Sequence, residues 1–129
     1  MKDETAEWAS FAKGNIRAAQ KTIDDAELTR EVIFWCQQAI EKYLKAYLVE
    51  HDKKIRKTHD LLSIYAEVKS IQDWGLDEYL LNQISNIYTV IRYPKYLGVG
   101  LPQIEEAKRY LEFALDVEKI FCKLLGEGQ

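Results

Sequence analysis

The stretch EVIFWCQQAIEKYLKAYL, residues 31–48, decides the fold of this chain. Its apolar side chains recur every three or four positions, as they do on one face of an α-helix. With Leu28 just before it, that face consists of Leu28, Val32, Trp35, Cys36, Ala39, Ile40, Tyr43, Leu44, Tyr47 and Leu48. Gln37, Glu41 and Lys45 take the opposite side of the same helix. So wide an apolar face predicts the central helix of a bundle, from about Asp25 to Glu50.

The segment before this helix predicts another one, from about Glu4 to Ile23. Its apolar stripe consists of Trp8, Phe11, Ala12, Ile16, Ala19 and Ile23. Asp24 and Glu27 have the spacing of a capping box, so the second helix is expected to start directly after the first.

Three further helices are indicated downstream. Thr58 is a candidate cap for a third helix with His59 and Asp60 in its first turn, and Trp74-Gly75 stops it. Asp77 is a candidate cap for a fourth helix, which Pro94 ends. Pro102 suits the first position of the last helix, which runs to Gly126.

This pattern predicts an all-α fold: an up-and-down antiparallel bundle of four long helices plus one short helix. Residues 1–129 are expected to form a single domain, because that length suits one core. Aromatic residues make up 12% of the chain and include eight tyrosines. Two interpretations of these tyrosines stay open: they line the core with their hydroxyls in water, or some form a second apolar surface that dimerises.

Composition narrows the class of protein. The net charge of −3 and the pI near 5.5 argue against a DNA-binding protein coated with basic residues. No signal segment and no apolar run long enough for a membrane span are visible, so we expect a cytoplasmic protein with no membrane contact. Cys36 and Cys122 lie far apart in apolar patterns and are expected to be free, buried thiols.

Motifs for metals and cofactors are missing. The two histidines are eight positions apart, no cysteine pair occurs, and Gly98-Val-Gly100 stands alone without the context of a phosphate-binding loop. We therefore expect no metal and no cofactor.

Two segments remain as candidate binding sites. Between His51 and His59 lie Lys53, Lys54, Arg56 and Lys57, a cationic loop that can hold phosphate or serve simply as a solvated connection. The second segment, residues 92–96, is RYPKY. There Arg92 and Lys95 can pair with phosphate while Tyr93 and Tyr96 stack on bases; the alternative is a proline-fixed helix stop.

The sequence resembles the HEPN family, a helical family named for higher eukaryotes, prokaryotes and nucleotide binding. Three stretches carry the resemblance: FWCQQAIEKYLKAYL (residues 34–48), THDLL (58–62) and IRYPKY (91–96). Their order and spacing extend the likeness from about Trp8 to Leu125. The first stretch is the most distinctive.

The resemblance implies a homodimeric bundle, often encoded beside a minimal nucleotidyltransferase, with roles in nucleotide binding or in a toxin–antitoxin pair. Many members are metal-independent ribonucleases in which an arginine and a histidine downstream of it are separated by four to six intervening residues. Arg92 fills the arginine position, but Leu97, Gly98 and Val99 stand where the histidine belongs. The catalytic pair of the family is therefore broken.

Three functions follow as hypotheses. The first is a binding module for a nucleotide, an RNA or a nucleotidyltransferase partner, with Arg92, Tyr93, Lys95, Tyr96, His59 and Lys57 at the site. The second is a ribonuclease that uses Arg92 with His59 supplied from another helix. The third is a dimerisation scaffold without a ligand.

Overall fold

The computed structural model describes residues 1–91 and 101–126, with the backbone alone for residues 88–91. Within these ranges the chain forms five helices and no strand. They are α1 (Asp3–Thr22), α2 (Thr29–Glu50), α3 (Leu61–Ile71), α4 (Glu78–Ile91) and α5 (Ile104–Leu125). The predicted all-helical bundle is confirmed.

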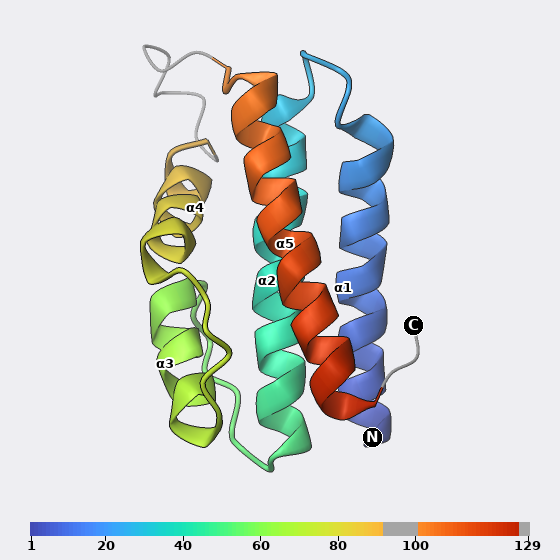
Figure 1. Ribbon diagram of the computed structural model, residues 1–129, viewed down its shortest axis with the longest axis vertical. Coiled ribbons are helices and arrows are strands. Elements are labelled where there is room, and N and C mark those ends of the chain that lie inside the picture. The colour runs from blue at the N-terminus through green and yellow to red at the C-terminus, as the bar shows by residue number, and fades with distance from the viewer. Residues whose placement is uncertain (92–100, 127–129) are drawn as a thin grey trace.

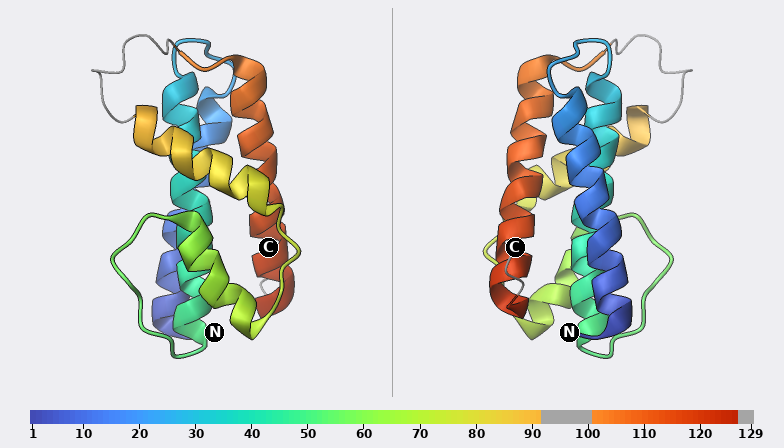
Figure 2. Two further views of the ribbon diagram at one scale, coloured as in Figure 1. Left: turned by 90° about the vertical axis from the view of Figure 1, so that its left-hand side faces the viewer. Right: turned by 90° about the vertical axis from the view of Figure 1, so that its right-hand side faces the viewer.

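The three longest helices, α1, α2 and α5, run up and down beside one another (Figure 1). The shorter helices α3 and α4 are inclined to them and cover one side of α2 (Figure 2). As its wide apolar face predicts, α2 is central, because it contacts each of the other four helices. Among the described helices, none is both long and apolar enough to cross a membrane.

Tyrosine supplies much of the core. Tyr43, Tyr47, Tyr65 and Tyr110 are almost fully buried. The hydroxyls of the first three bond to side chains at the edge of the core: Tyr43 to Glu118, Tyr47 to Gln72 and Tyr65 to Asp73. These four tyrosines therefore line the core, as one of the two interpretations held, but three of their hydroxyls bond to protein groups rather than to water alone.

The predicted start of the second helix is wrong by four residues, because α2 begins at Thr29. The Asp25 carboxylate instead accepts a hydrogen bond from the Glu27 amide at 2.9 Å, inside the connection between α1 and α2. Aspartate often closes a turn in this way, two residues ahead of itself. The Asp25 carboxylate thus stabilises the turn between the two helices, and Asp24 and Glu27 do not form the predicted capping box at the start of α2.

Two other helix starts also differ from the prediction. Asp60, not Thr58, caps α3, and its side chain accepts from the Leu62 amide. Gln103 is the N-cap residue of α5, so Pro102 lies before the helix rather than in its first position. Two signals are confirmed: Asp77 caps α4 by accepting from the Tyr79 and Leu80 amides at 3.0 and 3.2 Å, and Gly126 ends α5 with a φ of 74°. The third helix ends at Ile71, before the predicted stop at Trp74-Gly75, and Pro94 lies outside the described residues.

Candidate functional site

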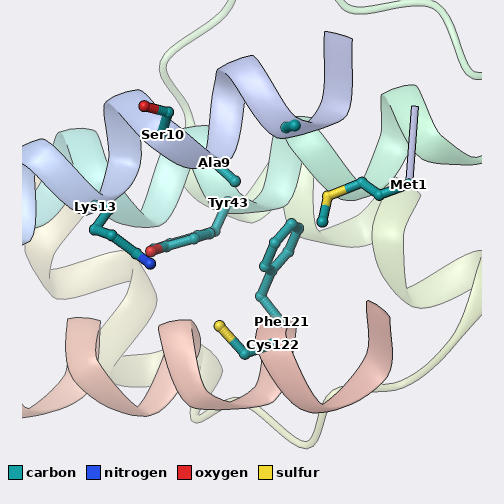
Figure 3. A pocket seen from close by; sticks show the side chains of 8 residues that line it. Met1, Ala9, Ser10, Lys13, Tyr43, Phe121 and Cys122 are labelled. Atoms are coloured by element: carbon teal, nitrogen blue, oxygen red, sulfur yellow. The ribbon is translucent and has the colours of Figure 1, made fainter. Parts of the chain in front are cut away.

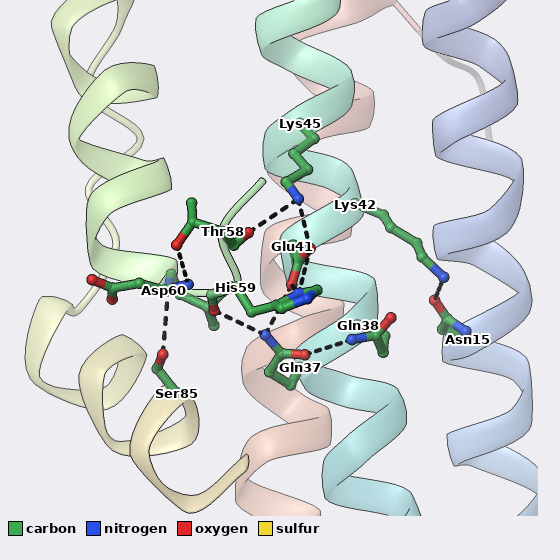
Figure 4. Close-up of polar contacts among 11 residues, drawn as sticks. Asn15, Gln37, Gln38, Glu41, Lys42, Lys45, Thr58, His59, Asp60 and Ser85 are labelled. Carbon is green, nitrogen blue, oxygen red and sulfur yellow. Dashed lines mark hydrogen bonds and ion pairs between the residues drawn. The ribbon is translucent and has the colours of Figure 1, made fainter. Parts of the chain in front are cut away.

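The polar side of α2 is covered by protein. Gln37, Glu41 and Lys45 are 0%, 5% and 6% exposed, so the side of α2 opposite its apolar face is buried as well. They follow one another at intervals of four residues and lie on one face of the helix. The segment that leads from α2 to α3 runs over this face and covers it (Figure 4). The residues Gln37, Glu41, Lys45, Thr58 and His59 are called the His59 corner below.

Glu41 is the centre of this corner. Its carboxylate accepts from Lys45 Nζ at 2.7 Å and from Gln37 Nε2 at 3.1 Å. The same two donors also reach the covering segment: Lys45 Nζ donates to the Thr58 carbonyl at 3.1 Å, and Gln37 Nε2 donates to the His59 carbonyl at 3.3 Å. Buried charges and amides are stable only when their hydrogen bonds are made. The corner meets that requirement with hydrogen bonds that hold the backbone around His59 against α2.

The His59 imidazole is held by the same carboxylate. Its Nδ1 atom lies 3.0 and 3.1 Å from the two oxygens of Glu41, while its side chain stays 59% exposed. An ionised carboxylate only accepts hydrogen bonds, so Nδ1 is the donor, and in the neutral ring Nε2 is then the acceptor. A surface imidazole is thus fixed in orientation by a buried acid, which is how proteins prepare a histidine to bind or to move a proton.

The start of α3 joins α4 to this corner. Thr58 Oγ1 accepts from the Asp60 amide at 3.1 Å, and the Leu61 amide lies 3.4 Å from Ser85 Oγ on α4 (Figure 4). Arg92 follows Ser85 by seven positions in the sequence. Arg92, Tyr93, Lys95 and Tyr96 themselves lie outside the described residues.

The cationic loop lies directly before the corner. Lys53, Lys54, Arg56 and Lys57 are all exposed. Arg56 pairs with Glu67, with 2.5 Å between Nε and Oε2. The three lysines make no ion pair with any described residue. Positive charge therefore remains available to a ligand on the loop that leads to His59.

Two aromatic–cation contacts extend the corner toward α1. Lys45 Nζ lies 5.9 Å from the centre of the Trp8 ring, and Lys42 Nζ lies at the same distance from Phe11, which is 60% exposed. Lys42 also donates to Asn15 Oδ1 at 3.0 Å. Burial lowers the pKa of Lys42, and the nearby Glu41 charge opposes that shift.

Sequence reasoning missed Gln37, Glu41 and Lys45 as site residues. The available signal was the breadth of the apolar face of α2, which leaves little of the helix for solvent. Polar residues spaced by four on such a helix are candidates for a buried network.

The described residues do not support a metal site or a nucleophilic Cys36. No group of three metal-ligating side chains occurs there. Cys36 is free, as predicted, and fully buried, and burial raises its pKa to about 12, so its thiol is not a nucleophile at neutral pH. Cys122 likewise takes part in no disulfide among the described residues but is only partly buried, which corrects the expectation of two buried thiols.

Comparison with known proteins identifies a family for this chain. The model of the HEPN domain matches residues 5–125. No curated protein matches the chain. No solved structure matches it either. The family match covers all five helices, including both segments that meet in the His59 corner. This chain belongs to the HEPN domain family.

Proposed function

We propose that the chain is a nucleotide-binding module and that its binding site is built on the His59 corner. HEPN membership makes it a nucleotide- or RNA-related module in general. The observation that carries the finer proposal is an exposed imidazole whose orientation is fixed by the buried Glu41–Lys45 pair. A pre-oriented group binds a ligand with less loss of conformational entropy than a mobile one.

Charge supports a phosphate-bearing ligand. The chain as a whole carries −3, yet Lys57 and two further lysines precede His59 in the same loop without ion-pair partners among the described residues. In the proposal, His59 and Lys57 contact phosphate from one side. Arg92 and Lys95 contact it from the other, and Tyr93 or Tyr96 stacks on the base.

The packing of α4 supports bringing these two segments together. Ser85 contacts the backbone of Leu61 at the start of α3, two residues after His59. An α-helix rises about 1.5 Å per residue, so the six positions from Ser85 to Ile91, the last residue of α4, correspond to about 9 Å along its axis, and Arg92 is the next residue in the sequence. An arginine side chain and a triphosphate can span that separation.

The proposal includes partners. The chain is assigned to the nucleotidyltransferase-associated branch, as a homodimer that docks a minimal nucleotidyltransferase in a toxin–antitoxin pair. The stretches THDLL and IRYPKY, two of the three that carry the resemblance to the family, are those of the proposed site, and the Arg-Tyr-Pro form of the second resembles a docking surface of that branch. Nucleotide binding and docking would then use one surface.

Calorimetric titration with ATP, GTP, CTP and UTP tests the binding function. We expect saturable binding of at least one nucleotide that weakens as salt is raised. Hydrogen bonds to charged groups contribute about 1.5–3 kcal/mol each, so Arg92→Ala and His59→Ala should each weaken binding at least tenfold. Lys123→Ala, which removes an exposed cation on α5, is the matched control.

Unchanged affinity in Arg92→Ala would contradict the site. Absence of binding to all four nucleotides would contradict the nucleotide function and favour protein docking, which capture of a nucleotidyltransferase by the wild-type chain then tests. Identical behaviour of wild type and Arg92→Ala in both assays would leave the scaffold function.

A metal-independent ribonuclease is the second candidate, and one observation favours it. The Glu41–His59 hydrogen bond orients the ring as a carboxylate orients a catalytic histidine. His59 Nε2 would take or give the proton, and Arg92 would stabilise the charged phosphorane.

Cleavage of single-stranded and hairpin RNA in the presence of a chelator tests this function. Activity should be lost in His59→Ala and reduced in Glu41→Gln, which keeps the shape of the side chain but removes its charge. Intact RNA at high protein concentration, or full activity of His59→Ala, contradicts the ribonuclease.

A further inference from the structure

Two hollows lie between α1 and α5, and Tyr43 is the one lining residue that comes from α2, the helix of the His59 corner. The larger, called the cationic hollow, has a volume of about 670 Å³ and is lined by Lys13, Ile16, Arg17, Gln20, Leu115, Glu118, Lys119 and Cys122. The smaller, called the apolar hollow, has a volume of about 190 Å³ and is lined by Met1, Ala6, Ala9, Ser10, Lys13, Tyr43, Phe121 and Cys122. Lys13 and Cys122 line both, so the two hollows adjoin.

The cationic hollow has more positive charge than its own residues neutralise. Lys13 and Arg17 line it from α1, and Lys119 lines it from α5. None of the three makes an ion pair with a described residue. Glu118 is the one acid in the lining, and its Oε2 already accepts a 2.5 Å hydrogen bond from the Tyr43 hydroxyl. Cations on facing walls repel each other, and a bound anion would remove that repulsion.

The apolar hollow continues this site with a surface for a hydrocarbon. Met1, Phe121 and Cys122 point into the space between α1 and α5, beside the Tyr43 ring on α2 (Figure 3). Phe121 and Tyr43 are 0% and 1% exposed and pack against each other beneath this hollow, with ring centres 4.9 Å apart. The floor is therefore rigid and apolar.

The size of the hollows selects the kind of ligand. A helix with its side chains is about 10–12 Å in diameter, so even one turn of it needs more space than the apolar hollow, whose volume is about 190 Å³. An alkyl chain fits such a space, and an anionic head at one end of it would reach the cations of the adjoining hollow.

We propose that the α1–α5 groove binds a long-chain carboxylate, with its head among Lys13, Arg17 and Lys119 and its alkyl chain against Tyr43 and Phe121. Binding here is independent of the His59 corner. Charge complementarity places the head, and burial of the chain supplies most of the affinity, since each buried methylene raises affinity about fourfold.

Calorimetry with octanoate, dodecanoate and dodecanol, all below their aggregation limits, tests this proposal. Dodecanoate should bind at least tenfold more tightly than octanoate, because two further buried methylenes are enough for that gain. It should also bind at least tenfold more tightly than dodecanol, which lacks the charge. The double variant Arg17→Gln/Lys119→Gln should lose at least tenfold in dodecanoate affinity.

The control is Lys21→Gln/Lys123→Gln, which removes two charges from the same two helices outside both hollows. It should bind dodecanoate as the wild type does. All four positions are exposed, and circular dichroism checks that the variants fold. Absence of saturable dodecanoate binding, equal affinity for dodecanoate and dodecanol, or full affinity in Arg17→Gln/Lys119→Gln would each overturn the proposal.

Discussion

Replacing Lys45 by methionine tests the buried pair on which the His59 corner rests. Lys45 Nζ lies 2.7 Å from Glu41 Oε2, and the two side chains are 8% and 6% exposed. Removing one partner of a buried pair costs about 3–5 kcal/mol, because the other charge stays buried without compensation. Gln37 and His59 still bond to Glu41 in the variant, so we expect the lower end, about 3 kcal/mol. A domain with the usual stability of about 5–15 kcal/mol remains folded after that loss.

Urea unfolding followed by circular dichroism measures this cost. With a denaturant slope of about 1–3 kcal/mol per molar urea, the midpoint should fall by roughly 1–3 M. The control is Lys69→Met, which breaks a 2.8 Å pair with Glu78 whose side chains are 45% and 49% exposed. That change should cost less than about 1 kcal/mol. Equal, small losses in Lys45→Met and Lys69→Met would refute the reasoning, because they would mean that Glu41 and Lys45 are solvated.

Three further predictions concern stability. Asp60→Ala should cost about 0.5–2 kcal/mol in urea unfolding and Thr58→Ala less, because Asp60 is the cap of α3; the reverse order would contradict that assignment. Burial raises the pKa of Cys36 from 9.0 to about 12, so the folded state holds this proton more tightly, and the resulting stability is complete below pH 9.0 and lost as the pH rises toward 12. Alkaline unfolding should therefore be shallower in Cys36→Val, and an unchanged pH profile would contradict the shift. Gly14→Ala, in open space on α1, should raise the melting temperature, whereas Gly75→Ala, at a φ of 70°, should lower it; shifts in the same direction would contradict this.

The helices could be predicted from the sequence because the apolar residues that recur with a helical period are also the residues that are buried, along most of the described chain. The stripe of α2 identified the central helix, and Asp77 and Gly126 marked the start of α4 and the end of α5. Helix starts were harder to predict. Thr58 and Asp60 are both good caps, and only the folded path of the loop decides that Asp60 bonds to the helix.

The candidate site was only partly predictable. His59 was identified by its chemistry, but a period of 3.6 residues describes one helix and cannot say which distant segment covers its polar side. Glu41 is 18 positions from His59, and their contact depends on the loop folding back over α2. Long-range contacts of this kind follow from tertiary packing rather than from local pattern.

The most direct test of the proposed site follows the two imidazoles by nitrogen-15 NMR during titration with the nucleotide that binds best in calorimetry. The chain has two histidines, so His51 is an internal reference: it packs against Tyr47 with ring centres 4.4 Å apart, at the other end of the loop. We expect the His59 ring resonances to shift until they saturate, with the same dissociation constant that calorimetry gives, while the His51 ring resonances stay nearly unchanged. Saturable binding with an unmoved His59 ring would contradict the site.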